Sequence, residues 1–292
     1  MIAVKVAVIV HVYYPGLWQE LAGCIANIDE PFDLFVTCAD GCVAAAVKRE
    51  FPHANVMTVE NVGFDIWPFL KVLNAIDLSS YSSIVKLHTK RDVPSEPRIV
   101  IGGMDCTGAA WRNELLSFIA TPDAWAASKR MISRPDVAAV AGCRCIVRRN
   151  DVPKCVRYVF DQALQAVHDM GLKPRRPQFV GGTMFLMRAA MLRPLQGRWD
   201  ASSFDVPAGH KSNTFAHLVE RMIGFCACTN GMRITDPYDN LGSYRRCRMI
   251  GDLAAAVRRF FFQVKVKDGI CTVKIMKIAV RSYKTKPAGE IR

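Results

Sequence analysis

The sequence lacks several features that identify whole classes of protein. It contains no run of 18 uninterrupted apolar residues, so no membrane-spanning helix is predicted. Residues 1–12 lack the cationic start and long apolar region of a signal peptide. None of the eleven cysteines forms a C-x-x-C pair, the spacing typical of zinc sites, and many lie in apolar segments. These absences predict a cytoplasmic protein whose cysteines are mostly buried, reduced thiols.

Low-complexity linkers and internal repeats are also missing, which argues against an array of small modules. The chain has 292 residues, 51% of them hydrophobic, which is enough for a large core. We therefore expect one α/β domain over residues 1–243, followed by a basic amphipathic extension over residues 244–292.

Positive charge is concentrated in that extension. Residues 244–292 contain 13 of the 39 Lys and Arg residues but 3 of the 26 Asp and Glu residues. Such a segment is typical of a nucleic-acid-binding tail or of a surface held against anionic lipid. No nucleic-acid-binding motif is recognised, so we expect residues 245–286 to rest on the inner face of the cell membrane. A final helix and strand pair with lysines facing water is the alternative.

The first third of the chain alternates between strand and helix patterns. Short apolar runs rich in β-branched residues predict buried strands at 4–13, 33–38, 55–59 and 83–88. Amphipathic segments between them predict helices at 17–28, 42–51 and 66–76. This order is typical of parallel sheets with right-handed crossovers. The predicted fold class is α/β, a Rossmann-like, mostly parallel sheet flanked by helices.

The rest of the chain continues the α/β pattern. Helices are expected at 111–119, 123–133, 154–170 and 214–224, and strands at 137–141 and 179–188. The last strand contains Gly181 and Gly182. Glycines inside a strand mark either the close approach of a ligand or close core packing.

Open parallel sheets bind ligands at the carboxyl ends of their strands. This rule selects residues 13–14, 37–41, 61–69 and 88–92, which are unusually polar and aromatic. In the third of these segments, Gly63 permits a backbone conformation that other residues resist. Asp65 lies near a helix start, where it could cap backbone donors. Alternatively, Asn61 and Asp65 bind sugar hydroxyls.

Lys86, His88 and Lys90 end the fourth predicted strand. In an extended strand these alternate residues project to one side. Three potential cations on one face repel one another unless an anion lies nearby, and a diphosphate would fit. A solvated basic strand end is the alternative.

His217, Glu220 and Arg221 are spaced i, i+3 and i+4 on a predicted helix, so they share a face. A neighbouring cation could hold Glu220 ionised as a general base. A surface ion-pair face is the alternative.

Taken in order, these segments resemble the rhamnan synthesis protein F family of bacterial polysaccharide glycosyltransferases. The matching residues are His11-Val12-Tyr13-Tyr14-Pro15 with Trp18, Asn61, Gly63, Asp65-Ile66, Pro68-Phe69, Lys86-Leu87-His88-Thr89-Lys90, Trp111-Arg112, Gly182-Thr183-Met184-Phe185, His217 and Glu220-Arg221. Two positions depart: Phe64 stands where arginine is expected and Leu186 where tryptophan is expected.

The resemblance implies a glycosyltransferase A-like fold, dTDP-rhamnose as the donor, and a cell-envelope polysaccharide or lipid-linked glycan as the acceptor. Many enzymes of that fold hold a metal ion with Asp-x-Asp after the fourth strand, where this chain has His88-Thr89-Lys90. Asp92 is the nearest carboxylate and stands alone. We therefore expect no obligatory metal, with Mg²⁺ or Mn²⁺ as an option through Asp92. Lys86, His88, Lys90 and Arg112 would neutralise the leaving diphosphate.

The expected roles follow from the chemistry of glycosyl transfer. Glu220 is the first candidate for the base that deprotonates the acceptor, His217 its alternative or partner, and Asp65 the third candidate. Tyr13 or Tyr14 would stack on thymine, and Asp40 would accept from its N3–H. The substrate-binding set also includes Asn61, Gly63, Trp111, Gly182 and Thr183.

Three alternatives remain open. One is a transferase of the same fold that uses another sugar nucleotide. The others are a basic nucleic-acid-binding protein and a non-catalytic subunit of a synthesis complex.

Overall fold

The computed structural model describes residues 5–39, 43–92, 100–101, 104–105, 109–204, 214–246, 249–250, 253, 262–267, 270–275 and 278–284. The chain divides into two compact units, Met1–Leu241 and Gly242–Arg292. In the described part, no helix is both long and apolar enough to traverse a bilayer.

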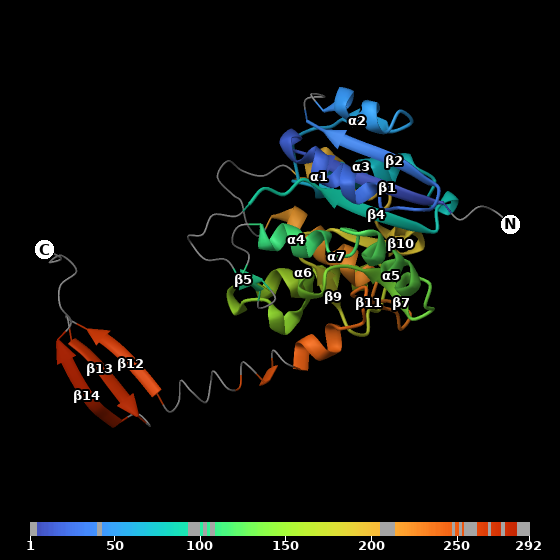
Figure 1. Ribbon diagram of the computed structural model, residues 1–292. Helices are drawn as coiled ribbons and strands as arrows, with labels where there is room; N and C mark the ends of the chain where they lie inside the picture. The colour runs from blue at the N-terminus through green and yellow to red at the C-terminus, as the bar shows by residue number, and fades with distance from the viewer. Residues whose placement is uncertain are drawn as a thin grey trace, which may run out of the picture. The chain divides into compact units, whose positions relative to one another are not determined.

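The first unit is built on a seven-stranded sheet with the order β3-β2-β1-β4-β10-β7-β11 (Figure 1). The first four strands along the chain are β1 (Val6–Val12), β2 (Phe32–Cys38), β3 (Asn55–Thr58) and β4 (Ser83–His88). The other three are β7 (Val137–Val140), β10 (Phe185–Arg188) and β11 (Arg233–Thr235). Only β10 runs antiparallel to its neighbours in this sheet. The predicted α/β class with a mostly parallel sheet is confirmed.

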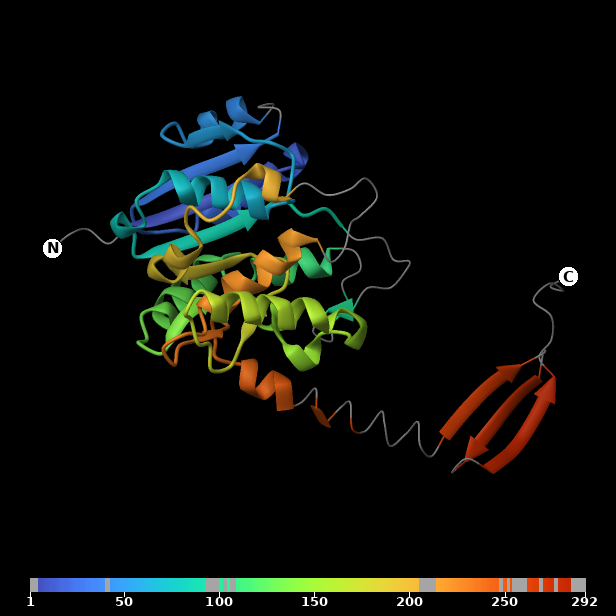
Figure 2. The same ribbon diagram turned by 180° about the vertical axis from the view of Figure 1, so that it is seen from behind.

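Helices cover both faces of this sheet (Figures 1 and 2). The α-helices are α1 (Trp18–Ile25), α2 (Ala44–Glu50), α3 (Ile66–Ala75), α4 (Ala110–Leu116), α5 (Pro122–Ile132), α6 (Arg157–Asp169) and α7 (Phe215–Cys226). The 3-10 helices are η1 (Pro15–Leu17), η2 (Leu78–Ser80), η3 (Cys143–Cys145), η4 (Arg149–Asp151), η5 (Lys154–Val156), η6 (Ala189–Leu195) and η7 (Ala201–Phe204). Helices α3 and α7 contact each other, so residues from these two elements can share a site.

The core explains why the alternating segments adopt this order. Every residue of β1 is buried, as expected for a central parallel strand covered on both faces. Helix α3 buries five consecutive residues, Ile66–Leu70, so its first turns are covered on all sides. Helix α5 begins at Pro122, and the Thr121 hydroxyl accepts the Ala124 N–H at 3.1 Å as its cap.

The predicted single strand over residues 179–188 is wrong. The segment divides into β9 (Gln178–Val180), which pairs with β8 (Ile146–Arg148), and β10, which enters the large sheet. Left-handed φ angles of 83° at Gly182 and 49° at Thr183 turn the chain between them. A further short pair joins β5 (Val100–Ile101) to β6 (Met104–Asp105).

The second unit contains an antiparallel sheet of β12 (Phe262–Lys267), β13 (Ile270–Ile275) and β14 (Ile278–Lys284). The alternating pattern over residues 264–275 predicts the first two strands. The alternative for this extension was a final helix and strand pair with lysines facing water, and the described residues add a third strand to that pair.

Candidate functional site

A buried polar cluster lies where β4 ends, beside α3 and the turn before β10. We call it the Asp65 cluster; it comprises Asp65, Lys86, His88 and Thr183. Asp65 Oδ2 accepts hydrogen bonds from Lys86 Nζ and from Thr183 Oγ1, the latter at 2.5 Å. Lys86 Nζ also donates to Thr183 Oγ1 at 2.8 Å, and His88 Nδ1 lies 3.4 Å from Asp65 Oδ2. One carboxylate oxygen therefore joins three segments of the chain.

This geometry corrects two expectations. Within the described residues, the Asp65 side chain does not cap α3, because its carboxylate turns toward Lys86 and Thr183. Burial raises the pKa of Asp65, but the neighbouring His88 and Lys86 outweigh it and hold this pKa below its usual range. Burial lowers the pKa of Lys86, and Asp65 opposes that shift. The second expectation was that the charge of Lys86 needs a bound anion. Asp65 already balances that charge inside the protein.

Two buried histidines lie side by side beneath this cluster. His11 on β1 is opposite His88 on β4 and opposite Thr37 on β2. His11 Nδ1 is 3.0 Å from Thr37 Oγ1. Burial lowers the pKa of His11 to about 4 and that of His88 to about 3. Burial therefore favours the neutral form of both rings near pH 7, so the positive charge of this cluster lies on Lys86.

Lys90 lies beyond the end of β4, so it does not continue the row of Lys86 and His88. Its Nζ is 4.5 Å from the centre of the Trp111 ring. The next residue, Arg91, places its guanidinium carbon 5.4 Å from the ring of Tyr14. Among the described residues, neither Lys90 nor Arg91 is paired with a carboxylate. Arg91 was missed as a site residue, although it lies in the segment that the sheet-edge rule selected.

Arg112, also expected to meet a diphosphate, already has acidic partners. Its Nε lies 2.8 Å from Glu20 Oε2, and it is paired with Asp92. Arg112 also donates to the Lys90 carbonyl at 3.1 Å. Its charge is therefore balanced, and its contacts fix the backbone at Lys90.

Tyr13 and Tyr14 lie just past β1, with their rings edge to face at 4.8 Å. Both backbone N–H groups donate to Thr89 Oγ1, each at 2.9 Å. Thr89 is buried and was not predicted as a site residue. Its hydroxyl joins the chain after β1 to the chain after β4, which positions both tyrosines. Asp40, which was expected to accept a hydrogen bond from the thymine N3–H, lies outside the described residues.

Glu220 lies on α7 and meets the turn before β10. The Gly182 N–H donates to Glu220 Oε1 at 2.9 Å, and Arg221 lies 3.5 Å from Oε2. Burial raises the pKa of Glu220, while Arg221 and the Gly182 N–H oppose this shift. The alternative of a surface ion-pair face is wrong, because Arg221 is buried and Glu220 mostly so. A carboxylate with a raised pKa is better matched to accept a proton near neutrality.

His217, the alternative base, lies one turn before Arg221 on the same helix. Its Nδ1 is 2.9 Å from Thr214 Oγ1 at the start of α7. Burial and the charge of Arg221 lower the pKa of His217. Its ring contacts Phe64 edge to face, with centroids 5.6 Å apart. His217 therefore connects α7 to the loop that carries Asp65.

Two left-handed dipeptides flank Asp65. Gly63-Phe64 immediately precedes it in the chain. Gly182-Thr183 supplies the Thr183 hydroxyl, which donates a hydrogen bond to Asp65 Oδ2. A side chain at Gly63 would place Cβ 2.6 Å from Phe204 Cδ1. Left-handed backbone at Phe64 and Thr183 is costly because bulky and β-branched residues avoid it. Such strain concentrates at functional sites.

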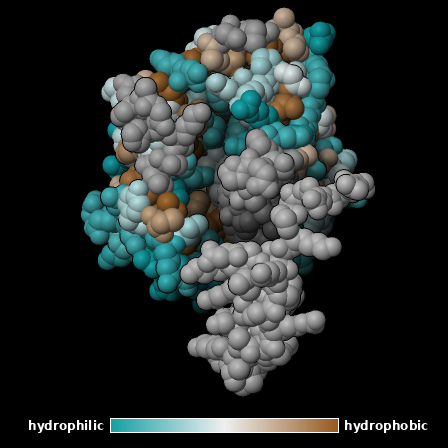
Figure 3. Space-filling model, turned by 90° about the vertical axis from the view of Figure 1, so that its left-hand side faces the viewer, coloured by the Kyte–Doolittle hydropathy of each residue, from teal (hydrophilic) through white to brown (hydrophobic). Residues whose placement is uncertain are grey.

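Asn61 is exposed at the start of this loop, outside the buried cluster. Of the proposed Asn61 and Asp65 pair, only Asp65 therefore belongs to the network. Figure 3 faces the edge where the carboxyl ends of the parallel strands emerge, and the described surface there is hollowed.

The described residues near Asp92 do not fit a divalent cation. The carboxylate of Asp92 is paired with Arg112, which competes with a metal for its oxygens. Within the described part of the chain, no group of three or more His, Cys, Asp or Glu side chains converges as a metal site would require.

The strand order and the one antiparallel strand of this sheet are consistent with a glycosyltransferase A-like fold. The chain belongs to the rhamnan synthesis protein F family, whose model matches residues 2–232. The family takes its name from the synthesis of rhamnan, a polysaccharide.

Two relatives come from strains of Xanthomonas campestris pv. campestris, one of them B100. Both are called "Uncharacterized protein WxcX" and are 26% identical to this chain over 244 residues. The match covers 80% of this chain and 33% of each relative, so the chain spans about a third of their length.

Proposed function

We propose that this protein is a glycosyltransferase that moves rhamnose from dTDP-rhamnose onto a bacterial cell-envelope polysaccharide. The observation that supports this best is that two carboxyl groups meet the same turn before β10, Asp65 through Thr183 Oγ1 and Glu220 through the Gly182 N–H. Asp65 has a lowered pKa, while burial raises the pKa of Glu220. Environments that separate two carboxylates in this way are typical of sites that divide acid–base roles.

In the proposed reaction, the donor's diphosphate lies against Lys90 and Arg91. These two cations are unpaired among the described residues and project beside Trp111 and Tyr14. Glycosyl transfer has an oxocarbenium-like transition state, so positive charge beside the departing diphosphate lowers the barrier. Arg112 holds the backbone at Lys90, and Tyr13 or Tyr14 stacks on thymine.

Glu220 is the proposed base for the acceptor hydroxyl. Asp65 is less suited to this role because its Oδ2 is occupied by Lys86 and Thr183. His217 is the second candidate, since its lowered pKa keeps the ring neutral and able to accept a proton. The Gly182 N–H and the Thr183 hydroxyl hold the two acids in place.

We also propose that transfer needs no obligatory metal ion, since Lys90 and Arg91 supply the positive charge. Loss of activity with EDTA and its recovery with Mg²⁺ or Mn²⁺ would overturn this part. The basic extension, residues 245–286, is proposed to rest on an anionic membrane surface at the cytoplasmic face. Binding to anionic but not to neutral vesicles, lost at high salt, is the expected result.

The decisive experiment measures thermal stability and product release against dTDP-rhamnose, dTDP-glucose, UDP-glucose and GDP-mannose. A bound donor raises the melting temperature by mass action. We expect dTDP-rhamnose to give the largest shift, and Lys90→Met to reduce it. Lys48→Met, an exposed lysine on α2, is the matched control and leaves the shift unchanged. A larger shift with another donor would favour the same fold with a different sugar nucleotide. Salt-sensitive DNA binding without any donor shift would contradict the proposal.

A further inference from the structure

Phe64 is an aromatic residue in an unusual position. Its φ angle is 56°, in the left-handed region, and its side chain is 48% exposed. Bulky residues rarely adopt this conformation, because the side chain crowds the following carbonyl oxygen. A half-exposed ring recovers only part of the cost of this crowding through burial. Packing within the described residues therefore does not account for phenylalanine here.

The surroundings of Phe64 connect it to the candidate site. It directly precedes Asp65, and its ring meets His217 edge to face at 5.6 Å. Gly63, just before it, packs so closely on Phe204 that the loop has little freedom to relax. The left-handed conformation thus holds the ring beside two candidate polar groups, with about half of its surface open to solvent.

We propose that the ring of Phe64 stacks on the apolar face of a pyranose ring and so forms a platform for a sugar. This inference rests on the proposed function, glycosyl transfer. A pyranose presents C–H groups on one face and hydroxyls around its rim. An aromatic ring binds that face, while neighbouring polar side chains such as His217 meet the rim. A 6-deoxy sugar adds a methyl group, which increases the apolar area that Phe64 covers. The platform is therefore a specificity determinant for deoxy sugars.

The same ring could receive the donor sugar or the acceptor sugar, and the test separates them. Phe64→Asn removes the ring but suits a left-handed backbone, whereas Phe64→Tyr keeps the ring. In the donor case, Phe64→Asn weakens dTDP-rhamnose binding about 3- to 10-fold and leaves dTDP binding unchanged. In the acceptor case, donor binding is unchanged and the KM for methyl α-rhamnoside rises by a similar factor. Phe64→Tyr restores wild-type values in both cases.

Thermal stability supplies a readout independent of sugars. We expect Phe64→Asn to melt at or above the wild-type temperature, because the substitution relieves backbone strain. Tyr158→Asn, a half-exposed aromatic on α6, is the control and leaves sugar binding unchanged.

Three results would overturn the inference: a fall of several degrees for Phe64→Asn, equal weakening of dTDP and dTDP-rhamnose, or no change in either donor or acceptor binding. If the wild-type protein binds another donor of the panel, the same comparison uses that donor and its free nucleotide. If it binds none, the proposed function itself fails.

Discussion

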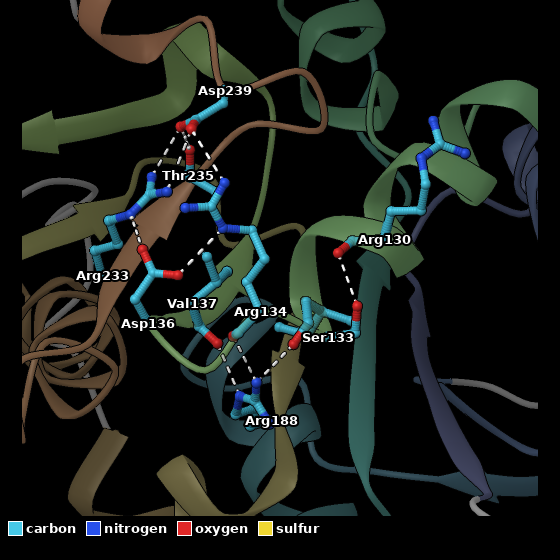
Figure 4. Close-up of polar contacts among 10 residues, drawn as sticks. Arg130, Ser133, Arg134, Asp136, Val137, Arg188, Arg233, Thr235 and Asp239 are labelled. Atoms are coloured by element: carbon cyan, nitrogen blue, oxygen red, sulfur yellow. Dashed lines mark hydrogen bonds and ion pairs between the residues drawn. The ribbon is translucent and has the colours of Figure 1, made fainter.

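Charged residues cluster at both ends of the large sheet, but the two clusters differ in how deeply they are buried. At the carboxyl end, the Asp65 cluster is buried and its pKa values are strongly displaced. At the amino ends of β7 and β11 lies a second group, which we call the Arg233 network: Arg134, Asp136, Arg188, Arg233 and Asp239 (Figure 4). The comparison separates buried charges with strongly displaced pKa values from ion pairs at a partly exposed surface.

Every acid in the Arg233 network meets arginine across a partly exposed surface. Arg233 donates to Asp136 Oδ2 and to Asp239 Oδ1, each at 2.9 Å. Arg188 donates to the Val137 carbonyl at 2.8 Å, which fixes the end of β10 against β7. The hydrogen bonds from Arg233 lower the pKa values of Asp136 and Asp239, which keeps both ionised. Solvent screens such pairs, so each contributes little.

The largest effect on stability is expected when one partner of the buried Asp65–Lys86 pair is removed. Asp65→Leu leaves Lys86 buried without a counter-charge, which should cost about 3–5 kcal/mol in the free energy of unfolding. Urea unfolding followed by circular dichroism measures this loss. The double variant Asp65→Leu with Lys86→Met removes both charges and should regain most of the stability without activity. A double variant as unstable as the single one would show that the pair is not the cause.

Glu220→Gln tests the chemical role of the second acid. Glutamine keeps an oxygen for the Gly182 N–H but cannot accept the proton, so turnover should fall about 100-fold or more. Donor affinity should stay unchanged in a calorimetric titration. Because burial raises the pKa of Glu220, wild-type turnover should rise with pH through a midpoint above the usual glutamate range. If Glu220→Gln lowers turnover less than His217→Gln does, His217 is the better candidate for the base.

The buried histidines make the carboxyl end sensitive to acid. The pKa of His11 is about 4 when folded and about 6.5 when unfolded, so the unfolded chain binds more protons between these values. Stability is therefore lost as pH falls from about 6.5, by about 2 kcal/mol at pH ~5. His11→Gln should remove much of this loss, as measured by urea unfolding at several pH values. The exposed His168→Gln should not change the slope.

The smallest effect is expected in the Arg233 network. Asp239→Asn should lower the free energy of unfolding by about 0.5 kcal/mol, and high salt should mask the difference. The pKa of Asp239 is lowered, so its contribution is present above the usual aspartate range and fades as pH falls through the folded value. A loss as large as that of Asp65→Leu would erase the distinction between the two ends.

The parallel half of the fold could be predicted because its signals are local. Buried strands β1, β2 and β4 are short apolar runs, and each helix between them has an amphipathic pattern. The turn at Gly182 escaped prediction because an apolar run with glycines resembles one strand. The break depends on left-handed backbone at Thr183, which residue type alone does not reveal.

The site residues were predictable in type and only partly in arrangement. Asp65 was selected by the rule that ligands meet strand ends, and Lys86 by the alternation of side chains along the fourth predicted strand. Their pairing was not, because it also depends on Thr183, which lies 118 residues from Asp65 and 97 from Lys86. The acids that balance Arg112 were missed for a similar reason, since Glu20 lies 92 residues away. The roles assigned to these residues stay predictions.

The position of β10 has a consequence for the nascent chain. Strand β4 pairs with β1 on one side and with β10 on the other, but β10 is synthesised about a hundred residues later. Until then, β4 is an edge strand, and its unpaired backbone N–H and C=O groups can pair with other chains. A lysine within such an edge strand discourages that association. Asp65 precedes Lys86 in the chain, so the partner of Lys86 that is still missing at this stage is Thr183, which is made 97 residues later.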